Sequence, residues 1–243
     1  MEMEKNEDLL SFREEFDFTE FQERVKISKE DFCVKAFREN RDTIQIKKEK
    51  TAVKNLNKIF EATFTICLRK GFQGMSMRDL SQESGLSMGA LYSYFRSKEE
   101  LLNTLQRVGN SFILQVLEEY HDAEKDAATQ LNTMIKVHLY LSEIAQQWFF
   151  FSYMEAKNLN KAERDVYKES ELSTEEMIFN ILKKGAEENI FKQRDHQLAA
   201  SVMKAMIQDW YLKRWKYAKR GISVDRYAEF IIEFVQSFYL SMD

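Results

Sequence analysis

Residues 71–102 read GFQGMSMRDLSQESGLSMGALYSYFRSKEELL, and this stretch decides the fold. Ser76 is followed three residues later by Asp79, a spacing that lets each side chain cap the backbone of the other. The pair predicts the start of a short helix over about residues 77–84. Four of the chain's seven glycines lie within the stretch, so sharp backbone turns are expected here.

A second short helix is predicted directly after the first. Gly85 supplies the backbone freedom for a turn, and Leu86 is an apolar plug at the junction of the two helices. Ser87 is a suitable cap for the second helix, which we expect over about residues 88–95. Two short helices joined across a glycine turn form a helix-turn-helix, whose second helix enters the major groove of DNA.

The second helix begins with small or slender side chains, which favours close approach to base edges. The first turn of a recognition helix enters the groove, where small residues let the backbone reach bases and thymine methyl groups. Tyrosine hydroxyls and the free N–H groups at helix starts suit phosphates. The residues predicted to contact DNA are Ser76, Arg78, Ser87, Met88, Gly89, Ala90, Tyr92, Tyr94 and Lys98. Leu91 and Phe95 are predicted to be core, and for Tyr92 packing and DNA contact remain equal alternatives.

Charge is distributed unevenly along the chain. The formal net charge is −4, yet residues 47–98 carry ten basic and four acidic side chains. A basic segment within an acidic protein indicates a local site for a polyanion. A chance cluster on a solvated face is the alternative, and the adjacent motif favours double-stranded DNA.

In order and spacing, these pieces resemble the TetR family of bacterial repressors. The matching elements are a long helix followed by Gly71-Phe72, Ser76, Asp79-Leu80, Gly85-Leu86-Ser87, Gly89, Leu91-Tyr92-Ser93-Tyr94-Phe95 and Ser97-Lys98-Glu99-Glu100-Leu101. The resemblance ends near Leu102. Tyr94 stands where the family often has His, and Met88 stands where it often has a polar or basic residue. Met88 shifts base readout toward apolar contact and leaves the operator sequence unpredicted.

Composition favours helices along the whole chain. It has no proline and seven glycines in 243 residues, fewer turn residues than a β-rich protein of this length needs. We predict an all-α fold, with an N-terminal helix-turn-helix three-helix DNA-binding domain followed by a larger helical ligand-binding and dimerisation domain. The expected divisions are an N-terminal extension over 1–46 with a short helix at about 29–40, a TetR-type DNA-binding domain over 47–102, and the helical domain over 103–243.

Capping residues and glycines also predict helix ends outside the motif. The first helix of the DNA-binding domain is expected to end at Gly71, a natural residue after a helix C-terminus. Ser173 with Glu176 predicts the start of a later helix. The penultimate helix is expected to be one long element that ends near Gly221.

The family resemblance implies a ligand pocket among the C-terminal helices. The aromatic block at 148–154 and the later tryptophans suit an apolar cavity, although core packing is the alternative for each residue. The candidate pocket residues are Trp148, Phe149, Phe150, Met154, Trp210 and Trp215. The expected effector is small and hydrophobic, a fatty acyl or aromatic compound. No cofactor is expected, and the lone histidines His138 and His196 do not form a metal-binding pattern.

The last helix has a continuous apolar face. Phe230, Phe234 and Phe238 lie four residues apart and form one ridge, which would be a large exposed patch in a monomer. We therefore predict a homodimer that binds a pseudo-palindromic operator with one recognition helix in each half-site. The predicted interface residues are Tyr227, Phe230, Ile231, Phe234 and Phe238. Packing within one chain is the alternative.

Several other protein classes do not fit the sequence. No apolar stretch approaches the roughly 20 residues of a membrane span. Two cysteines, Cys33 and Cys67, cannot form a disulfide framework, so a reducing cytoplasm is expected. The chain lacks a nucleophile–base pattern, a P-loop and a dinucleotide fingerprint, so it is not predicted to be an enzyme. We expect a repressor that a ligand releases from its operator; the alternative is an activator or nucleoid-associated factor without a small-molecule inducer.

Overall fold

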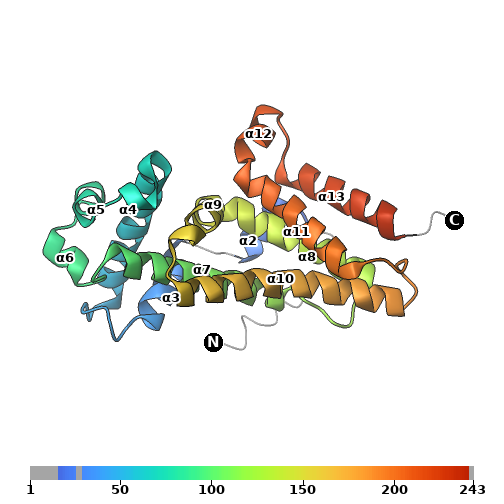
Figure 1. Cartoon of the computed structure of the whole chain (residues 1–243), viewed down its shortest axis with the longest axis horizontal. Helices are drawn as coiled ribbons and strands as arrows, with labels where there is room; N and C mark the ends of the chain where they lie inside the picture. Colours follow the sequence, from blue (N-terminus) through green and yellow to red (C-terminus); the bar gives the residue numbers. More distant parts are fainter. Residues whose placement is uncertain (1–15, 26–28, 241–243) are drawn as a thin grey trace.

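The computed structural model describes residues 16–25 and 29–240, and every regular element within these ranges is helical. The predicted all-α fold is therefore confirmed. Figure 1 shows the helices of the predicted DNA-binding region gathered at one end of the molecule and the chain's last helix toward the other. Within the described ranges, no helix has the length and apolar character that crossing a bilayer requires.

The helix-turn-helix forms as predicted. Its elements are α4 (Glu49–Gly74), α5 (Met77–Ser84), α6 (Met88–Tyr92) and the long α7 (Lys98–Glu119). Gly71 has a φ of 71° and interrupts α4 where the sequence predicted its end. Gly85 has a φ of 68°, the left-handed conformation that makes the turn between α5 and α6.

Helix α6 is shorter than the predicted 88–95. The backbone N–H groups of Tyr94 and Phe95 both donate to the carbonyl of Leu91, at 2.9 and 3.0 Å, which closes the helix in a tight turn. Gln45, from the segment before α4, donates its backbone N–H to the carbonyl of Ser93 at 2.9 Å. This hydrogen bond from outside the helix stabilises the turn. It joins residues far apart in the chain, so a local sequence pattern does not predict it.

Six further helices build the body. They are α8 (Ala127–Ile144), α9 (Gln146–Glu155), α10 (Lys161–Glu187), α11 (His196–Leu212), α12 (Arg214–Lys219) and α13 (Val224–Tyr239). The predicted helix start at Ser173 is wrong, because Ser173 lies inside α10 and its hydroxyl bonds to the carbonyl of Glu169. Asn160 caps that helix instead. The predicted long penultimate helix is broken at Lys213 into α11 and α12.

The N-terminal extension is part of the folded molecule where it is described. Helix α2 (Phe18–Val25) packs on α8, and α3 (Lys29–Glu39) packs on α4 and α7. The Phe21 ring is fully buried, with its centroid 5.4 Å from that of Tyr120 and 5.5 Å from that of Tyr140. The short helix expected at about 29–40 corresponds to α3. Residues 1–15 of the expected extension lie outside the described residues.

Two hydrophobic cores meet along α7. The first half of α7 contributes Leu101 through Val108 to the core that contains α4 to α6, while Ile113, Val116 and Leu117 belong to the body core. Helix α9 also reaches across, because Phe151 packs in the core of the helix-turn-helix. One continuous helix therefore links the two halves of the molecule.

Candidate functional site

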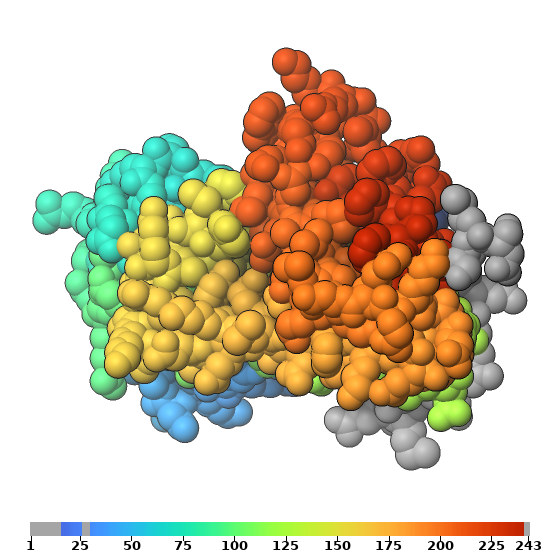
Figure 2. Space-filling view, turned by 45° about the vertical axis from the view of Figure 1, so that its right-hand side comes forward, coloured from blue at the N-terminus to red at the C-terminus, as the bar shows by residue number. Residues whose placement is uncertain are grey.

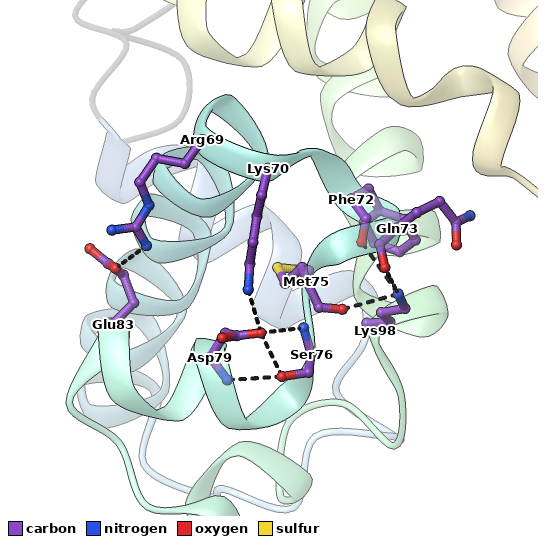
Figure 3. Close-up of polar contacts among 9 residues, drawn as sticks. All are labelled: Arg69, Lys70, Phe72, Gln73, Met75, Ser76, Asp79, Glu83 and Lys98. Carbon is purple, nitrogen blue, oxygen red and sulfur yellow. Dashed lines mark hydrogen bonds and ion pairs between the residues drawn. The ribbon is translucent and has the colours of Figure 1, made fainter.

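The start of α5 is fixed by a reciprocal cap. The backbone N–H of Asp79 donates to Ser76 Oγ at 3.2 Å, and that of Ser76 donates to Asp79 Oδ2 at 2.8 Å (Figure 3). Lys70 Nζ lies 2.8 Å from the same carboxylate. These partners hold the pKa of Asp79 well below its usual value, so the side chain stays ionised. The predicted capping box is present, and the Lys70–Asp79 ion pair ties α5 to α4.

Lys98 contacts the end of α4. Its ammonium donates to the carbonyls of Phe72, Gln73 and Met75 at 3.3, 3.1 and 3.0 Å (Figure 3). It also lies 4.9 Å from the centroid of the Phe72 ring. These carbonyls lie at the end of α4, so the cation caps them and opposes the negative end of the helix dipole. The Lys98 ammonium is therefore engaged by the end of α4, and its contact with phosphate stays a prediction.

The two tyrosines of the motif differ in exposure. Tyr94 is 2% exposed and its hydroxyl accepts a hydrogen bond from Asn55 Nδ2 at 3.0 Å. Burial raises the pKa of the Tyr94 hydroxyl. Tyr92, for which packing and DNA contact were equal alternatives, is 46% exposed. The phosphate contact predicted for Tyr94 is corrected to a core role, because the turn after α6 points its ring inward against α4.

The first turn of α6 presents the predicted reading surface. Ser87 caps the helix by accepting the N–H of Ala90 at 3.2 Å, and Met88 is 37% exposed. A methyl group placed on Gly89 would meet no atom within 4 Å, so this backbone is open to a partner. Ala90 is half-buried and sits at the edge of the surface. Arg78, on α5, is also exposed.

Polar contacts that the sequence analysis did not predict connect the end of α4 to the body. The buried carboxylate of Glu155 on α9 accepts the backbone N–H of Phe72 at 3.2 Å. Gln73 Nε2 donates to Asn158 Oδ1 at 2.8 Å. Both pairs join residues more than 80 positions apart, so only the folded chain reveals them.

The predicted pocket residues do not share one cavity. Trp148 and Phe149 line a small interior cavity of about 30 Å³ together with His138, Lys204 and other polar groups. That volume holds little more than a water molecule. Trp210 is fully buried in a stack with Tyr217 and Tyr227, whereas Trp215 is 69% exposed. Phe150 is half-buried and Met154 is 43% exposed.

Pocket assignments for Trp210 and Trp215 are therefore corrected. Trp210 Nε1 donates to Glu143 at 3.0 Å, and the Arg214 guanidinium lies 4.6 Å from its ring centroid, so the indole is a packing residue. Trp215 follows the break at Lys213, which turns it outward. Trp148 keeps its predicted place beside a cavity. Groups of three or more potential metal ligands are absent from the described part of the chain.

The α13 ridge is exposed, as the sequence predicted for a monomer. Phe230, Phe234 and Phe238 are 55%, 53% and 48% exposed. Leu198 and Val202 on α11 are also exposed. Figure 2 shows the deep-orange segment that includes α12 projecting from the body, with the red atoms of α13 below it. Two predicted interface residues, Tyr227 and Ile231, are instead buried within their own chain, because they lie on the adjoining face of α13, which packs on the body.

Comparison with known proteins identifies a family model and relatives to which this chain is similar. Residues 59–105 match the family model described as "Bacterial regulatory proteins, tetR family". The chain is 36% identical over 77 residues to the HTH-type transcriptional regulator PksA of Bacillus subtilis, which covers 32% of this chain and 34% of PksA. The match therefore spans about a third of that relative's length.

Longer similarities are weaker in sequence. The HTH-type transcriptional repressor KstR2 of Rhodococcus jostii is 23% identical over 70% of this chain and 84% of its own. The crystal structure of a bacterial regulatory protein in the tetR family from Rhodococcus RHA1 superposes with a TM-score of 0.69 at 19% identity, covering 76% of this chain and 97% of that one. The shared architecture thus extends beyond the helix-turn-helix.

Proposed function

We propose that this chain, whose residues 59–105 match the model of the tetR family of bacterial regulatory proteins, represses transcription by binding an operator as a homodimer. The observation that carries the proposal is the exposed first turn of α6, where Met88 and Gly89 face outward. A major groove accepts a helix of this kind. Arg78 and Tyr92 lie exposed nearby and suit phosphate oxygens.

The dimer is proposed from the exposed phenylalanines of α13. Three large rings on one helix form an apolar surface of the kind that homodimers bury, and Leu198 and Val202 are exposed apolar side chains on α11. A two-fold axis through it would pair the same residues of two chains. Two recognition helices about 34–36 Å apart would then occupy successive major grooves.

The DNA-binding proposal is tested by selecting sequences from a random duplex library with the purified protein. We expect an enriched pseudo-palindrome with half-sites one helical turn apart, and binding whose affinity falls steeply as salt rises. A library that shows no enriched sequence after several rounds would overturn the proposal of specific operator binding.

Repression and its release form the finer part of the proposal. The relative KstR2 is named a repressor, which favours that direction over activation. We propose a small hydrophobic effector that binds beside Trp148 and alters operator affinity. A reporter placed behind the selected operator distinguishes the directions: loss of the protein raises expression for a repressor, lowers it for an activator, and leaves it unchanged for a nucleoid-associated factor.

A further inference from the structure

Helix α9 lies between the body and the helix-turn-helix, and one of its faces is turned toward the helix-turn-helix. Trp148, Phe151, Ser152 and Glu155 are spaced at i, i+3, i+4 and i+7, so they share this face, and all four are buried. Figure 1 shows α9 next to α4, and the two helices pack together. The contacts of this face therefore determine how the DNA-binding helices are held on the body.

Two of these side chains bind α7. The Trp148 indole Nε1 donates to the carbonyl of Leu105 at 3.1 Å. Ser152 Oγ donates to Gln106 Oε1 at 2.5 Å, and Gln106 Nε2 donates to the carbonyl of Ser152 at 3.0 Å. Because α7 runs without a break from the core of the helix-turn-helix into the body, these bonds fix α9 against a helix that already joins the two halves of the molecule.

The other two side chains bind α4. The Phe151 and Phe64 rings meet edge-on, with their centroids 5.2 Å apart. Glu155 Oε1 accepts the backbone N–H of Phe72 at 3.2 Å, directly after the point where Gly71 interrupts α4. A ring contact permits sliding, whereas a hydrogen bond to one backbone atom has a defined direction. Glu155 therefore fixes the direction in which the chain leaves α4.

Both oxygens of the Glu155 carboxylate are used. Oε2 accepts a hydrogen bond from Asn158 Nδ2, and Asn158 Oδ1 in turn accepts one from Gln73 Nε2 at 2.8 Å. Phe72 and Gln73 are thus held from the body through one carboxylate and one amide. Glu155 is 7% exposed, so its loss would leave the Phe72 N–H buried without this acceptor.

Lys98, at the start of α7, binds the same segment. Its ammonium donates to three carbonyls within residues 72–75 (Figure 3). Ser76, the cap of α5, follows directly. Residues 72–75 are therefore held both by Glu155 of the body and by Lys98, immediately before the chain enters α5 and α6.

From these contacts we infer that Glu155 is a positioning residue, which sets the orientation of α5 and α6 on the body and hence the distance between the recognition helices of the proposed dimer. The orientation depends on contacts within one chain, whereas its consequence for DNA rests on the proposed function. Two recognition helices lie about 34–36 Å apart when they enter successive major grooves. A change of orientation in both protomers alters that distance, and therefore the half-site spacing that the dimer prefers.

Operator spacing gives the first test. The two half-sites selected from the random library are joined by the selected spacer and by spacers one or two base pairs shorter or longer. We expect the wild type to prefer the selected spacing by at least about tenfold, and Glu155→Ala to prefer it by less than about threefold. A loss of folded protein alone would weaken binding to every spacing by the same factor. A wild-type preference in folded Glu155→Ala would overturn the inference.

Two matched variants separate positioning from stability. Glu155→Gln keeps an oxygen that accepts the Phe72 N–H, and should keep the wild-type spacing preference. Ser152→Ala removes a hydrogen bond from α9 to α7 but leaves the contacts between α9 and α4, and should also keep the preference. A Ser152→Ala variant that loses the preference as fully as Glu155→Ala would show that the packing of α9 as a whole, and not Glu155, positions the helices.

A milder variant covers the case in which Glu155→Ala does not fold. Asn158 is half-buried, and its amide supports Glu155 and binds Gln73. Asn158→Ala should reduce the spacing preference by at least about threefold. An unchanged preference in Asn158→Ala would then overturn the inference.

A measurement without DNA tests the orientation directly. Spin labels are attached at exposed positions on α5 and α10 through Gln82→Cys and Glu176→Cys, in a chain that also carries Cys33→Ala and Cys67→Ala. Doubly labelled chains are diluted in unlabelled protein, so that the distances measured by pulsed electron paramagnetic resonance lie within one chain. These distances report the position of the helix-turn-helix relative to the body.

Glu155→Ala should broaden the distribution of label distances, whereas Glu155→Gln and Ser152→Ala should keep the wild-type width. An unchanged distribution in Glu155→Ala would overturn the inference whatever its effect on DNA binding. A broadened distribution in a protein that selects no operator would contradict the proposed function and retain the positioning role of Glu155.

Discussion

At the scale of single residues, Gly89 is a predicted DNA-contact position where an added side chain would disturb no neighbour in the fold. It lies on the exposed turn of α6, and an added Cβ meets no atom within 4 Å. Gly89→Val should leave the melting temperature nearly unchanged and lower specific operator affinity by at least about tenfold, because the branched group occupies the approach to base edges. Gly89→Ala serves as the smaller step of the same series. Native operator affinity in the valine variant would show that α6 is not the reading helix.

Replacing Lys98 is expected to change the stability of the protein, whereas replacing Arg78 is expected to change its binding to DNA. Lys98→Met removes three hydrogen bonds to the end of α4 and should lower the free energy of unfolding by about 1–2 kcal/mol. Arg78→Met removes an exposed cation and should leave stability unchanged while reducing the salt dependence of DNA binding by about one unit of slope. Urea unfolding and DNA titrations at several salt concentrations measure both. A reduced slope with unchanged stability for Lys98→Met would return Lys98 to the DNA interface.

His138 should make folding sensitive to mild acid. Burial and the nearby Lys204 ammonium hold the pKa of His138 well below its usual value, so the folded protein keeps it neutral. In the unfolded chain, His138 binds a proton near pH 6.5. The free energy of unfolding is therefore unaffected by this residue above that pH and decreases progressively as the pH falls below it. Between pH 6.5 and 5 the free energy of unfolding should fall by up to about 1.4 kcal/mol per pH unit through this residue.

The control for this prediction is His138→Leu, which removes the titrating ring from the core. Unfolding by urea at several pH values should give a flatter profile for the variant over the same window. His121 and His196 are present in both proteins, so their contributions cancel in the difference. Identical profiles would mean that His138 is not the source of the pH dependence.

At the scale of elements, α13 has two faces with different tasks. Tyr227 and Ile231 pack inside the chain, and Phe230, Phe234 and Phe238 point outward. Phe234→Glu introduces a charge at the middle of the ridge and should convert a dimer into a monomer at micromolar concentration without unfolding it. Light scattering measures the mass, and the same variant should lose specific DNA binding because one half-site alone is weak.

The matched control lies on an exposed part of another helix. Glu176→Lys changes the charge on α10 away from the ridge and should leave both mass and DNA binding intact. A wild-type protein that is monomeric at micromolar concentration, or a Phe234→Glu variant that remains dimeric, would exclude the ridge as the interface.

At the scale of the whole molecule, the N-terminal extension connects the two cores. Phe21 is fully buried between Tyr120 and Tyr140 of the body, and Lys136 Nζ donates to the carbonyl of Phe16 at 3.1 Å. Helix α3 then packs on α4 and α7. Phe21→Ala should lower the free energy of unfolding by about 3 kcal/mol, because it empties a packed aromatic site.

Chemical denaturation of the full chain measures this effect. Thr19→Ala, at an exposed position on the same helix, is the control and should change stability by less than about 0.5 kcal/mol. If Phe21→Ala were equally neutral, the extension would be an appendage rather than a part of the folded unit.

The sequence by itself determined the all-α fold, the helix-turn-helix and the exposed ridge of α13. These features follow from local rules: a serine and an aspartate three residues apart cap a helix, a glycine permits a left-handed turn, and apolar residues every four positions share one helix face. Each rule involves residues within a few positions of one another. For that reason the capping box at Ser76 and the turn at Gly85 could be located from the printed sequence.

Only the tertiary structure decided which of the motif's polar groups are free. Asn55 donates a hydrogen bond to the hydroxyl of Tyr94, 39 positions along the chain. The carbonyls of Phe72, Gln73 and Met75 accept hydrogen bonds from Lys98, which lies more than 20 positions away. The predicted pocket residues also differ in environment. The Trp210 ring stacks on Tyr217 in the core, whereas Trp215 points outward after the break at Lys213. A side chain's burial and partners depend on which distant helices pack around it, and sequence periodicity records only the face on which it lies.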